Sequence, residues 1–200
     1  MSYHGLRRER GHKKIDFGDK TEKFLWDKGL HPLIKQVQSL ARNDNRIIVP
    51  LDFKVVDYSG NTFHMTPEQL SEYPEKDTLS IYGIGPNTVA LFNEKIKESK
   101  TIYAKGSPTK DADQESKELF DAIVEARRKG AITILSGGDT NARVEEHGYS
   151  AQNDFTHFTL AGGATAEYMA GNLLPGLLML DLSHREFWGI KEDPILPPGY

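Results

Sequence analysis

The chain has 200 residues, of which 38% are hydrophobic and 27% charged, and its formal net charge is −4. This length is sufficient for one α/β domain with ordered arms and too short for an enzyme of two full-sized lobes. No stretch approaches the ~18 consecutive apolar residues of a membrane span, and the absence of cysteine excludes disulfides, thiolate metal sites and a cysteine nucleophile.

Residues 1–29 are predicted to form an N-terminal arm. Between positions 7 and 14, five basic residues stand against Glu9 alone, and no sustained period of 3.6 or 2 runs through the arm. The arm lacks the apolar centre of a signal peptide, so we expect it to stay on the protein. We do not expect it to bind nucleic acid, because the rest of the chain is acidic.

A domain is predicted over residues 30–183, built from helices and strands in alternation. Six segments have the length and apolar content of strands: residues 46–49, 78–82, 100–104, 131–135, 155–160 and 177–180. Helical spacing or capping signals occur at residues 30–41, from Thr66, and at 87–98, 111–128, 141–146 and 164–170. Near-continuous apolar strands that alternate with helices are typical of a parallel sheet covered on both faces.

The predicted fold class is therefore three-layer α/β, with a Rossmann-like parallel sheet, helices on both faces and extended arms at both ends. Residues 184–200 form the second arm. The prolines at positions 194, 197 and 198 are incompatible with helix or central strand, so this segment is predicted to be an extended tail.

Glycine-containing turns follow three of the predicted strands, at residues 83–86, 136–140 and 161–165. Paired glycines at such a position let backbone N–H groups approach a phosphate at a helix N-terminus, and an adjacent aspartate can hold a bound metal ion. The candidate phosphate-binding residues are Gly137, Gly138, Asp139, Thr140, Gly162, Gly163 and Ala164. The alternative is steric, because tight turns require glycine and because Asp139 and Thr140 are also good N-cap residues. The seven histidines show no metal-ligand spacing, so no metal site is predicted.

Five motifs in register resemble the nucleotide-binding, C-terminal domain of the phosphoglycerate kinase family. They are Leu51-Asp52 after the first strand, Ile84-Gly85-Pro86-Asn87-Thr88, Lys100 to Pro108, Ser136-Gly137-Gly138-Asp139-Thr140, and Ala161 to Thr165 followed by Leu174-Pro175-Gly176. The resemblance runs from about Leu33 to Leu182 and implies a truncated and degenerate form of that domain.

The departures from the family pattern concern its catalytic groups. The resemblance leaves no room for the substrate-binding N-terminal domain or for the G-G-A-K loop with its lysine. The asparagine of the family's N-G-P motif aligns with Lys105, and the glutamate that holds the ribose aligns with Ala112, while Asp113 is one residue out of register. We therefore expect no kinase activity and no catalytic residues, because phosphoryl transfer depends on such charges and on positioning.

The leading hypothesis is a non-catalytic, phosphoglycerate kinase-like structural subunit of a larger protein assembly, without a cofactor. Its partners would be proteins, bound through residues 1–28 and 184–200. One alternative is a regulatory module that binds Mg-ADP or Mg-ATP, and a second is a kinase half-enzyme that acts with a separate substrate-binding chain. The expected compartment is the cytoplasm, in a cytoskeletal or ciliary structure, with a mitochondrial complex as the alternative.

Overall fold

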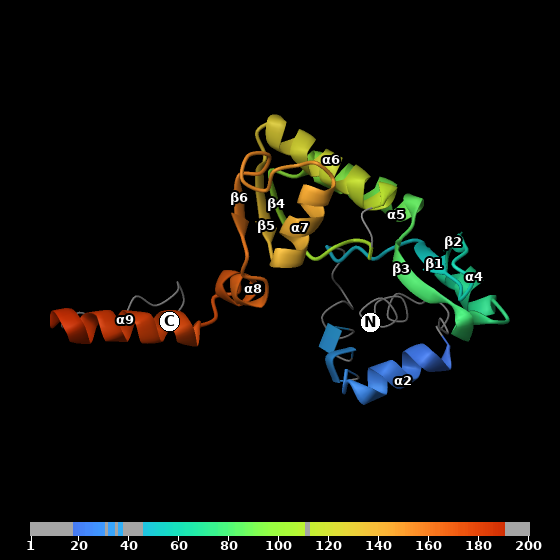
Figure 1. The fold of residues 1–200 in the computed structure, drawn as a ribbon, viewed down its shortest axis with the longest axis horizontal. Helices are drawn as coiled ribbons and strands as arrows, with labels where there is room; N and C mark the ends of the chain where they lie inside the picture. Colours follow the sequence, from blue (N-terminus) through green and yellow to red (C-terminus); the bar gives the residue numbers. More distant parts are fainter. Residues whose placement is uncertain (1–17, 31, 35, 38–45, 111–112, 191–200) are drawn as a thin grey trace. The chain divides into compact units, whose positions relative to one another are not determined.

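The computed structural model describes residues 18–30, 32–34, 36–37, 46–110 and 113–190. The chain divides into two compact units, one of residues 1–98 and 108–122, the other of residues 99–107 and 123–200. Helices and strands alternate through both units, and one of the two sheets is parallel (Figure 1). This confirms the predicted mixed α/β class, but two small sheets take the place of the single expected sheet.

The first unit contains an antiparallel sheet of order β2-β1-β3, formed by β1 (Phe53–Val56), β2 (Thr62–Met65) and β3 (Ser80–Ile84). The hairpin β1-β2 is closed by a turn in which Asp57 Oδ1 accepts the N–H groups of Ser59 (2.8 Å) and Asn61 (2.9 Å). Aspartate stabilises turns in this way. The prediction of a strand at residues 46–49 is wrong, because residues 47–50 have no regular structure and the first strand begins at Phe53.

Antiparallel pairing also corrects the expectation that residues 78–82 add a strand to a parallel sheet. Val55 of β1 lies opposite Phe63 of β2 and Ile81 of β3. The core on this sheet is formed by Phe53, Val55, Leu70 and Leu79. Leu70 belongs to α4 (Pro67–Glu72), whose predicted start is confirmed by a reciprocal capping box between Thr66 and Gln69.

Two longer helices complete the core of this unit. The predicted helices at 87–98 and 111–128 are present as α5 (Pro86–Glu98) and α6 (Gln114–Arg128). Val89 of α5 and Leu119 of α6 pack with Ile84, the last residue of β3. The carboxyl end of β3 and the N-terminus of α5 are thereby fixed to each other.

The N-terminal arm contains α2 (Asp19–Asp27), which the sequence pattern did not predict. Leu25 is 6% exposed, and α2 contacts the short 3-10 helix η1 (Lys76–Thr78), where the Asp77 carboxylate accepts the N–H of Lys20 at 3.2 Å. Of the predicted helix at 30–41, residues 32–34 and 36–37 are helical. Residues 1–17 lie outside the described residues.

The second unit contains the parallel sheet, of order β4-β5-β6 (Figure 1). β4 (Thr101–Lys105) and β5 (Ile132–Ser136) confirm the strands predicted at 100–104 and 131–135, whereas β6 (His157–Thr159) is shorter than the predicted 155–160. The predicted helices at 141–146 and 164–170 are present as α7 (Gly138–Glu146) and α8 (Gly163–Met169). Each of these helices begins directly after a glycine turn.

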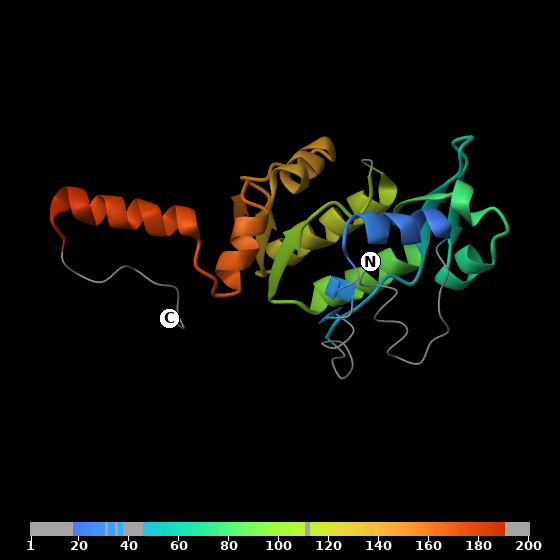
Figure 2. The ribbon, with the colours of Figure 1, turned by 90° about the horizontal axis from the view of Figure 1, so that it is seen from below.

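The last element, α9 (Pro175–Trp188), corrects two predictions. Residues 177–180 were expected to form a strand, but Pro175 occupies the first helical position and the apolar run continues as a helix of 14 residues (Figure 2). A short apolar run has no periodicity that separates strand from helix. The expected extended tail also starts too early, because residues 184–188 belong to α9; residues 191–200 lie outside the described residues.

Within the described part of the chain, no helix is long and apolar enough to cross a membrane. The same residues contain no group of histidine, aspartate and glutamate side chains suited to a metal ion.

Candidate functional site

The carboxyl ends of the three parallel strands bring the predicted phosphate-binding turns together. Lys105, the last residue of β4, pairs with Ser136 of β5, and Ser136 pairs with Thr159 of β6. A methyl group placed on Gly162 would lie 3.9 Å from Gly137 Cα and 3.9 Å from Lys105 Cε. The loops after all three strands therefore meet at one place, as ligand sites of open α/β sheets do.

Hydrogen bonds fix the turns to one another. Gly137 N donates to Thr159 O (2.9 Å), and Ser136 Oγ donates to Ala161 O (2.8 Å). Thr140 is 1% exposed; its hydroxyl accepts the N–H of Gly106 (2.8 Å) and donates to Ser136 O (2.9 Å). Thr140, a predicted phosphate-binding residue, is therefore a buried link between two loops, with its hydroxyl committed to the backbone.

The other predicted residues lie at the surface of these loops. Asp139 is exposed in the first turn of α7, and Ala164 is exposed in the first turn of α8. The N-cap of α7 is Gly137, and no side chain caps this helix. The expectation that Asp139 or Thr140 is the N-cap residue is thus wrong, because α7 begins at Gly138, two residues too early for Asp139 and three too early for Thr140 to hold that position.

A steric requirement for glycine applies to one of the four predicted glycines. Gly137 has φ +101°, a backbone conformation that side chains with a Cβ rarely adopt. Gly138 and Gly163 have open space where a Cβ would be, and a Cβ on Gly162 would meet its neighbours at ordinary contact distance. Packing in the described structure therefore does not require glycine at these three positions.

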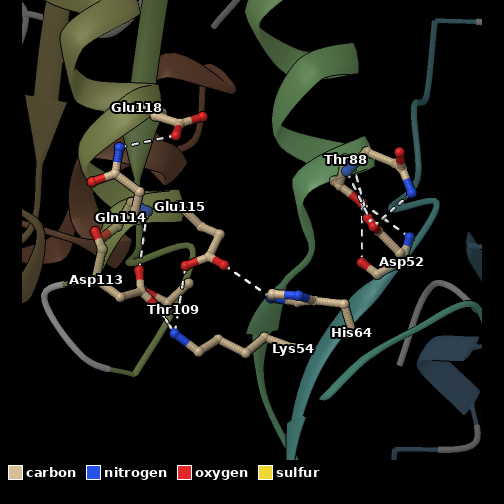
Figure 3. Close-up of polar contacts among 11 residues, drawn as sticks. Asp52, Lys54, His64, Thr88, Thr109, Asp113, Gln114, Glu115 and Glu118 are labelled. Atoms are coloured by element: carbon tan, nitrogen blue, oxygen red, sulfur yellow. Dashed lines mark hydrogen bonds and ion pairs between the residues drawn. The ribbon is translucent and has the colours of Figure 1, made fainter. Parts of the chain in front are cut away.

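The two motifs around Asp52 and Thr88 meet in a buried network in the first unit (Figure 3). Asp52 is 2% exposed, and its Oδ1 accepts Thr88 N (2.9 Å) and Thr88 Oγ1 (2.7 Å). Its Oδ2 accepts Asn87 N (3.1 Å) and Asn87 Nδ2 (2.9 Å). A Cβ on Gly85 would lie 2.4 to 2.8 Å from the atoms of this carboxylate. Asp52 thus caps α5 from another segment, and Gly85 must be glycine to admit it.

A second polar cluster links β1 and β2 to α6 in the same unit (Figure 3). Lys54 Nζ lies 2.6 Å from Asp113 Oδ2 and 3.4 Å from Glu115 Oε2, and His64 Nε2 lies 2.9 Å from Glu115 Oε1. Asp113 Oδ1 also accepts Thr109 Oγ1 (2.8 Å) and the N–H of Ser116 (3.1 Å). Both oxygens of Asp113 are engaged within the protein.

These contacts shift two pKa values in directions that stabilise the charged pair. Burial alone would raise the pKa of Asp113, but hydrogen bonds from Lys54, Ser116 and Thr109 and the Lys54 charge lower it below its ordinary value of 3.8. Burial alone would lower the pKa of Lys54, but its hydrogen bond with Asp113 and the charges of Asp113 and Glu115 raise it above its ordinary value of 10.5. Asp113 is therefore held as a carboxylate by its neighbours.

Sequence reasoning singled out Asp113 only as a displaced substitute for a ribose-binding glutamate, and it did not find Lys54, the partner that occupies the carboxylate. The two residues are 59 positions apart, and a single sequence carries no signal for such a pair. The position that the resemblance aligned with the glutamate, Ala112, lies outside the described residues.

Most of this chain is similar to proteins of one family. The profile of one family, phosphoglycerate kinase, matches residues 13–172. The chain is 30% identical over 176 residues to phosphoglycerate kinase of Plasmodium falciparum, and 33% identical over 162 residues to that of Agaricus bisporus. The first match covers 84% of this chain and 41% of the relative, and the second covers 78% and 38%.

A solved structure of a phosphoglycerate kinase is also similar to this chain. The crystal structure of phosphoglycerate kinase from Pyrococcus horikoshii superposes with a TM-score of 0.71 at 28% identity, over 92% of this chain and 44% of that chain. The chain thus spans about two fifths of the length of the relatives that it matches.

Proposed function

The chain belongs to the phosphoglycerate kinase family, and from that premise we propose that it is a non-catalytic member, a structural subunit that is held in a larger protein assembly. It corresponds to about two fifths of the enzymes it resembles. A kinase active site needs charged groups placed around the transferred phosphoryl group and a second substrate held in line with it. Asp113, one residue from the position of the family's ribose-binding glutamate, is engaged by Lys54 and Thr109 within the protein, which supports a loss of nucleotide contacts here.

The observation that carries this proposal is the surface of α9. This helix buries none of its residues, and six of its large apolar side chains are exposed: Leu177, Met179, Leu180, Leu182, Phe187 and Trp188. A helix that is apolar on most of its circumference is normally buried, and exposed apolar surface of this kind marks contact with another protein. We assign it to a protein contact within the assembly, together with residues 1–28 and the rest of 184–200.

The test of the proposal is the size of the particle that contains the chain in a cell extract. A tagged full-length chain should migrate with a large assembly, and Leu180→Ser combined with Phe187→Ser should shift it to the size of the free protein. The matched control, Ser183→Ala combined with Glu186→Gln, lies on the same helix and should stay in the assembly. Migration of the unaltered chain as a free protein would contradict the proposal.

Two further measurements test the catalytic activity of the chain and its location in the cell. The purified chain, given 3-phosphoglycerate and MgATP, should form no ADP above background, and turnover would contradict the non-catalytic assignment. Cell fractionation should find the tagged chain with a cytoskeletal or ciliary structure in our proposal, and recovery in mitochondria would favour the alternative assembly.

A second candidate function is a phosphate-binding regulatory module, and the glycine turns favour it. Gly138, Gly162 and Gly163 are not required by the backbone or by packing, and a turn without side chains leaves backbone N–H groups accessible to a phosphate. Lys105 stands in the position of the family's asparagine and adds a positive charge. The aliphatic part of its side chain lies close to Gly162. Calorimetric titration with MgADP and MgATP tests this function. Binding tighter than about 1 mM would support it, and absence of heat would leave the structural role.

A further inference from the structure

One side of α9 carries five exposed side chains at the spacing of a helix-helix contact, and we call them the α9 row. They are Leu177, Leu180, His184, Phe187 and Trp188. A helix turns by about 100° per residue, so the five side chains lie within an arc of about 100°. The rings of Phe187 and Trp188 meet edge to face with their centres 5.1 Å apart, and the His184 ring lies 6.3 Å from that of Trp188.

An apolar pocket of about 650 Å³ lies at the N-terminal end of the α9 row, within the second unit. Its walls are formed by β6, α8 and the start of α9, and they include Thr159, Tyr168 and Leu174. Leu177 and Leu180 line the pocket and also belong to the row. Pockets of roughly 300–1,000 Å³ hold drug-sized molecules, so this one has room for two aromatic rings.

The two ends of the α9 row are complementary to each other. At the C-terminal end the rings of Phe187 and Trp188 are 79% and 66% exposed. From Leu177 to Phe187 the spacings within the row are three, four and three residues, an order that is the same in both directions. Two antiparallel copies of α9 therefore place Leu177 of each opposite Phe187 of the other, at both ends at once. In this register Trp188 lies opposite Gly176, which has open space where a Cβ would be.

We propose that α9 pairs with α9 of a second copy of this chain in antiparallel orientation, so that the two rings at the end of each helix fill the pocket of the other copy. Such an interface has two-fold symmetry, and each copy contributes the same residues to it. The chain provides both halves of the contact, protruding rings and an apolar pocket, on one side of one helix. The α9 row contains no aspartate, glutamate, lysine or arginine, so no like charges from the two rows meet in the pair.

The surface that this pairing buries is sufficient for a stable dimer. An aromatic side chain buries about 150–250 Å², so the exposed parts of Phe187 and Trp188 amount to roughly 300 Å² in each copy. The pocket walls that cover the rings lose a similar area. The two symmetric contacts together bury about 1,200 Å², the lower limit of the roughly 1,200–2,000 Å² of specific interfaces. Leu177 and Leu180 add to this area, because they are 55% and 69% exposed.

The inference rests on the proposed function and deepens it, because it identifies one protein that α9 contacts as a second copy of the chain. The pairing covers one side of α9 only. Met179 and Leu182 are 63% and 42% exposed, and they lie about 140° and 160° around the helix from His184. The paired helices therefore keep apolar surface for contacts with other members of the assembly.

The mass of the purified full chain in solution tests the proposal. Light scattering after size-exclusion chromatography should give twice the mass of one chain at micromolar concentration. Phe187→Glu should give the mass of a single chain, because a carboxylate would have to enter an apolar pocket. The matched control, Met179→Glu, places the same charge at an exposed position on the other side of α9 and should stay dimeric. A single-chain mass for the unaltered protein, or equal masses for the two variants, would overturn the proposal.

Disulfide trapping tests the orientation of the helices, and the sequence suits this method because it contains no cysteine. In the antiparallel register Leu180 of one copy faces His184 of the other. A mixture of Leu180→Cys chains and His184→Cys chains should therefore form at least about tenfold more disulfide-linked dimer than either variant alone. A mixture of Met179→Cys and His184→Cys chains is the control and should form little. As much linked dimer from Leu180→Cys alone as from its mixture would indicate parallel helices and would overturn the proposal.

The dimer and the structural role can fail separately. A purified chain that is monomeric but migrates with a large assembly in a cell extract would refute the dimer and leave the structural role. A purified chain that is dimeric but migrates in the extract at the size of the dimer alone would refute the assembly and leave the dimer.

Discussion

At the scale of single residues, the buried carboxylate of Asp52 holds two segments in place. It accepts four hydrogen bonds from Asn87 and Thr88, two from backbone N–H groups and two from side chains. The first N–H groups of a helix have no partner within the helix, and a negative charge at this end is favourable. The network therefore fixes the start of α5 against the segment that leads into β1.

Replacement of Asp52 by asparagine should lower the free energy of unfolding by about 3 kcal/mol, because an amide N–H₂ would face donors and leave buried groups unpaired. Urea denaturation of the purified chain measures this. Asp27→Asn, at an exposed position in α2, is the control and should change stability by less than about 0.5 kcal/mol. A loss in Asp52→Asn no larger than in the control would show that the carboxylate is dispensable.

The Lys54 and Asp113 pair stabilises the fold in a pH-dependent way. The pKa of Asp113 is lowered from 3.8, so its contribution is present above that pH and is lost as the pH falls toward the folded-state value. The pKa of Lys54 is raised from 10.5, so its contribution is present below that pH and is lost as the pH rises through the folded-state value.

Replacement of Lys54 by methionine should therefore lower the urea midpoint at pH 7. It should also make the free energy of unfolding depend less on pH, both below about pH 3.8 and above about pH 10.5. The measurement is a series of urea titrations across pH. Lys95→Met, which removes an exposed ion pair with Glu98, should leave the profile near that of the unaltered chain. Identical profiles for the two variants would refute a special role for Lys54.

At the scale of elements, the turn between β5 and α7 contains two glycines with different demands. Gly137 has a positive φ and precedes the helix, whereas Gly138 is the first helical residue and has open space around it. Alanine is more favourable than glycine in a helix and less favourable in a left-handed conformation. Substitution of Gly137 therefore tests whether the backbone needs glycine in this turn, and substitution of Gly138 tests whether a bound phosphate does.

Gly137→Ala should lower the free energy of unfolding by at least about 1 kcal/mol, and Gly138→Ala should leave it unchanged or raise it slightly. Thermal melts of both variants, made side by side, measure the difference. If both substitutions destabilise the chain equally, the sequence-based steric explanation holds for both glycines. If Gly138→Ala is stable but loses heat on titration with MgADP, the phosphate-binding function gains support.

At the scale of the whole molecule, the described part of the predicted N-terminal arm, residues 18–29, contacts the rest of the first unit. Leu25 is buried and α2 contacts η1, so the second half of the segment is part of the first unit. Phe24 and Trp26, on the same helix, are 51% and 69% exposed. The attachment that we propose for this end of the chain concerns the segment before α2 and these exposed rings.

Deletion of residues 1–14 should leave the thermal midpoint within about 2 °C of the full chain and should reduce incorporation into the assembly. By contrast, Leu25→Ala should lower the midpoint by several degrees, because removal of a buried leucine side chain costs about 2–5 kcal/mol. Melting curves and the particle-size assay on both variants check this. A large drop in the midpoint on deletion would place residues 1–14 in the folded unit.

The sequence by itself determined the elements whose signals are local. α4, α5, α6, β4 and β5 follow from capping residues, helical spacing and apolar runs that lie within each segment. The glycine turns after β5 and β6 were found for the same reason, and so was the family, because its motifs are short and occur in order.

The tertiary structure decided what depends on distant partners. The pairing of β1 with both β2 and β3 makes the first sheet antiparallel, and no pattern within a strand specifies its neighbour. Lys54 engages Asp113 across 59 positions, which changes that carboxylate from a candidate ligand group into part of the fold. The apolar run at 177–180 is helical because it lies within a longer helix that begins at Pro175 and ends before Gly189. Four apolar residues alone do not distinguish a helix from a strand.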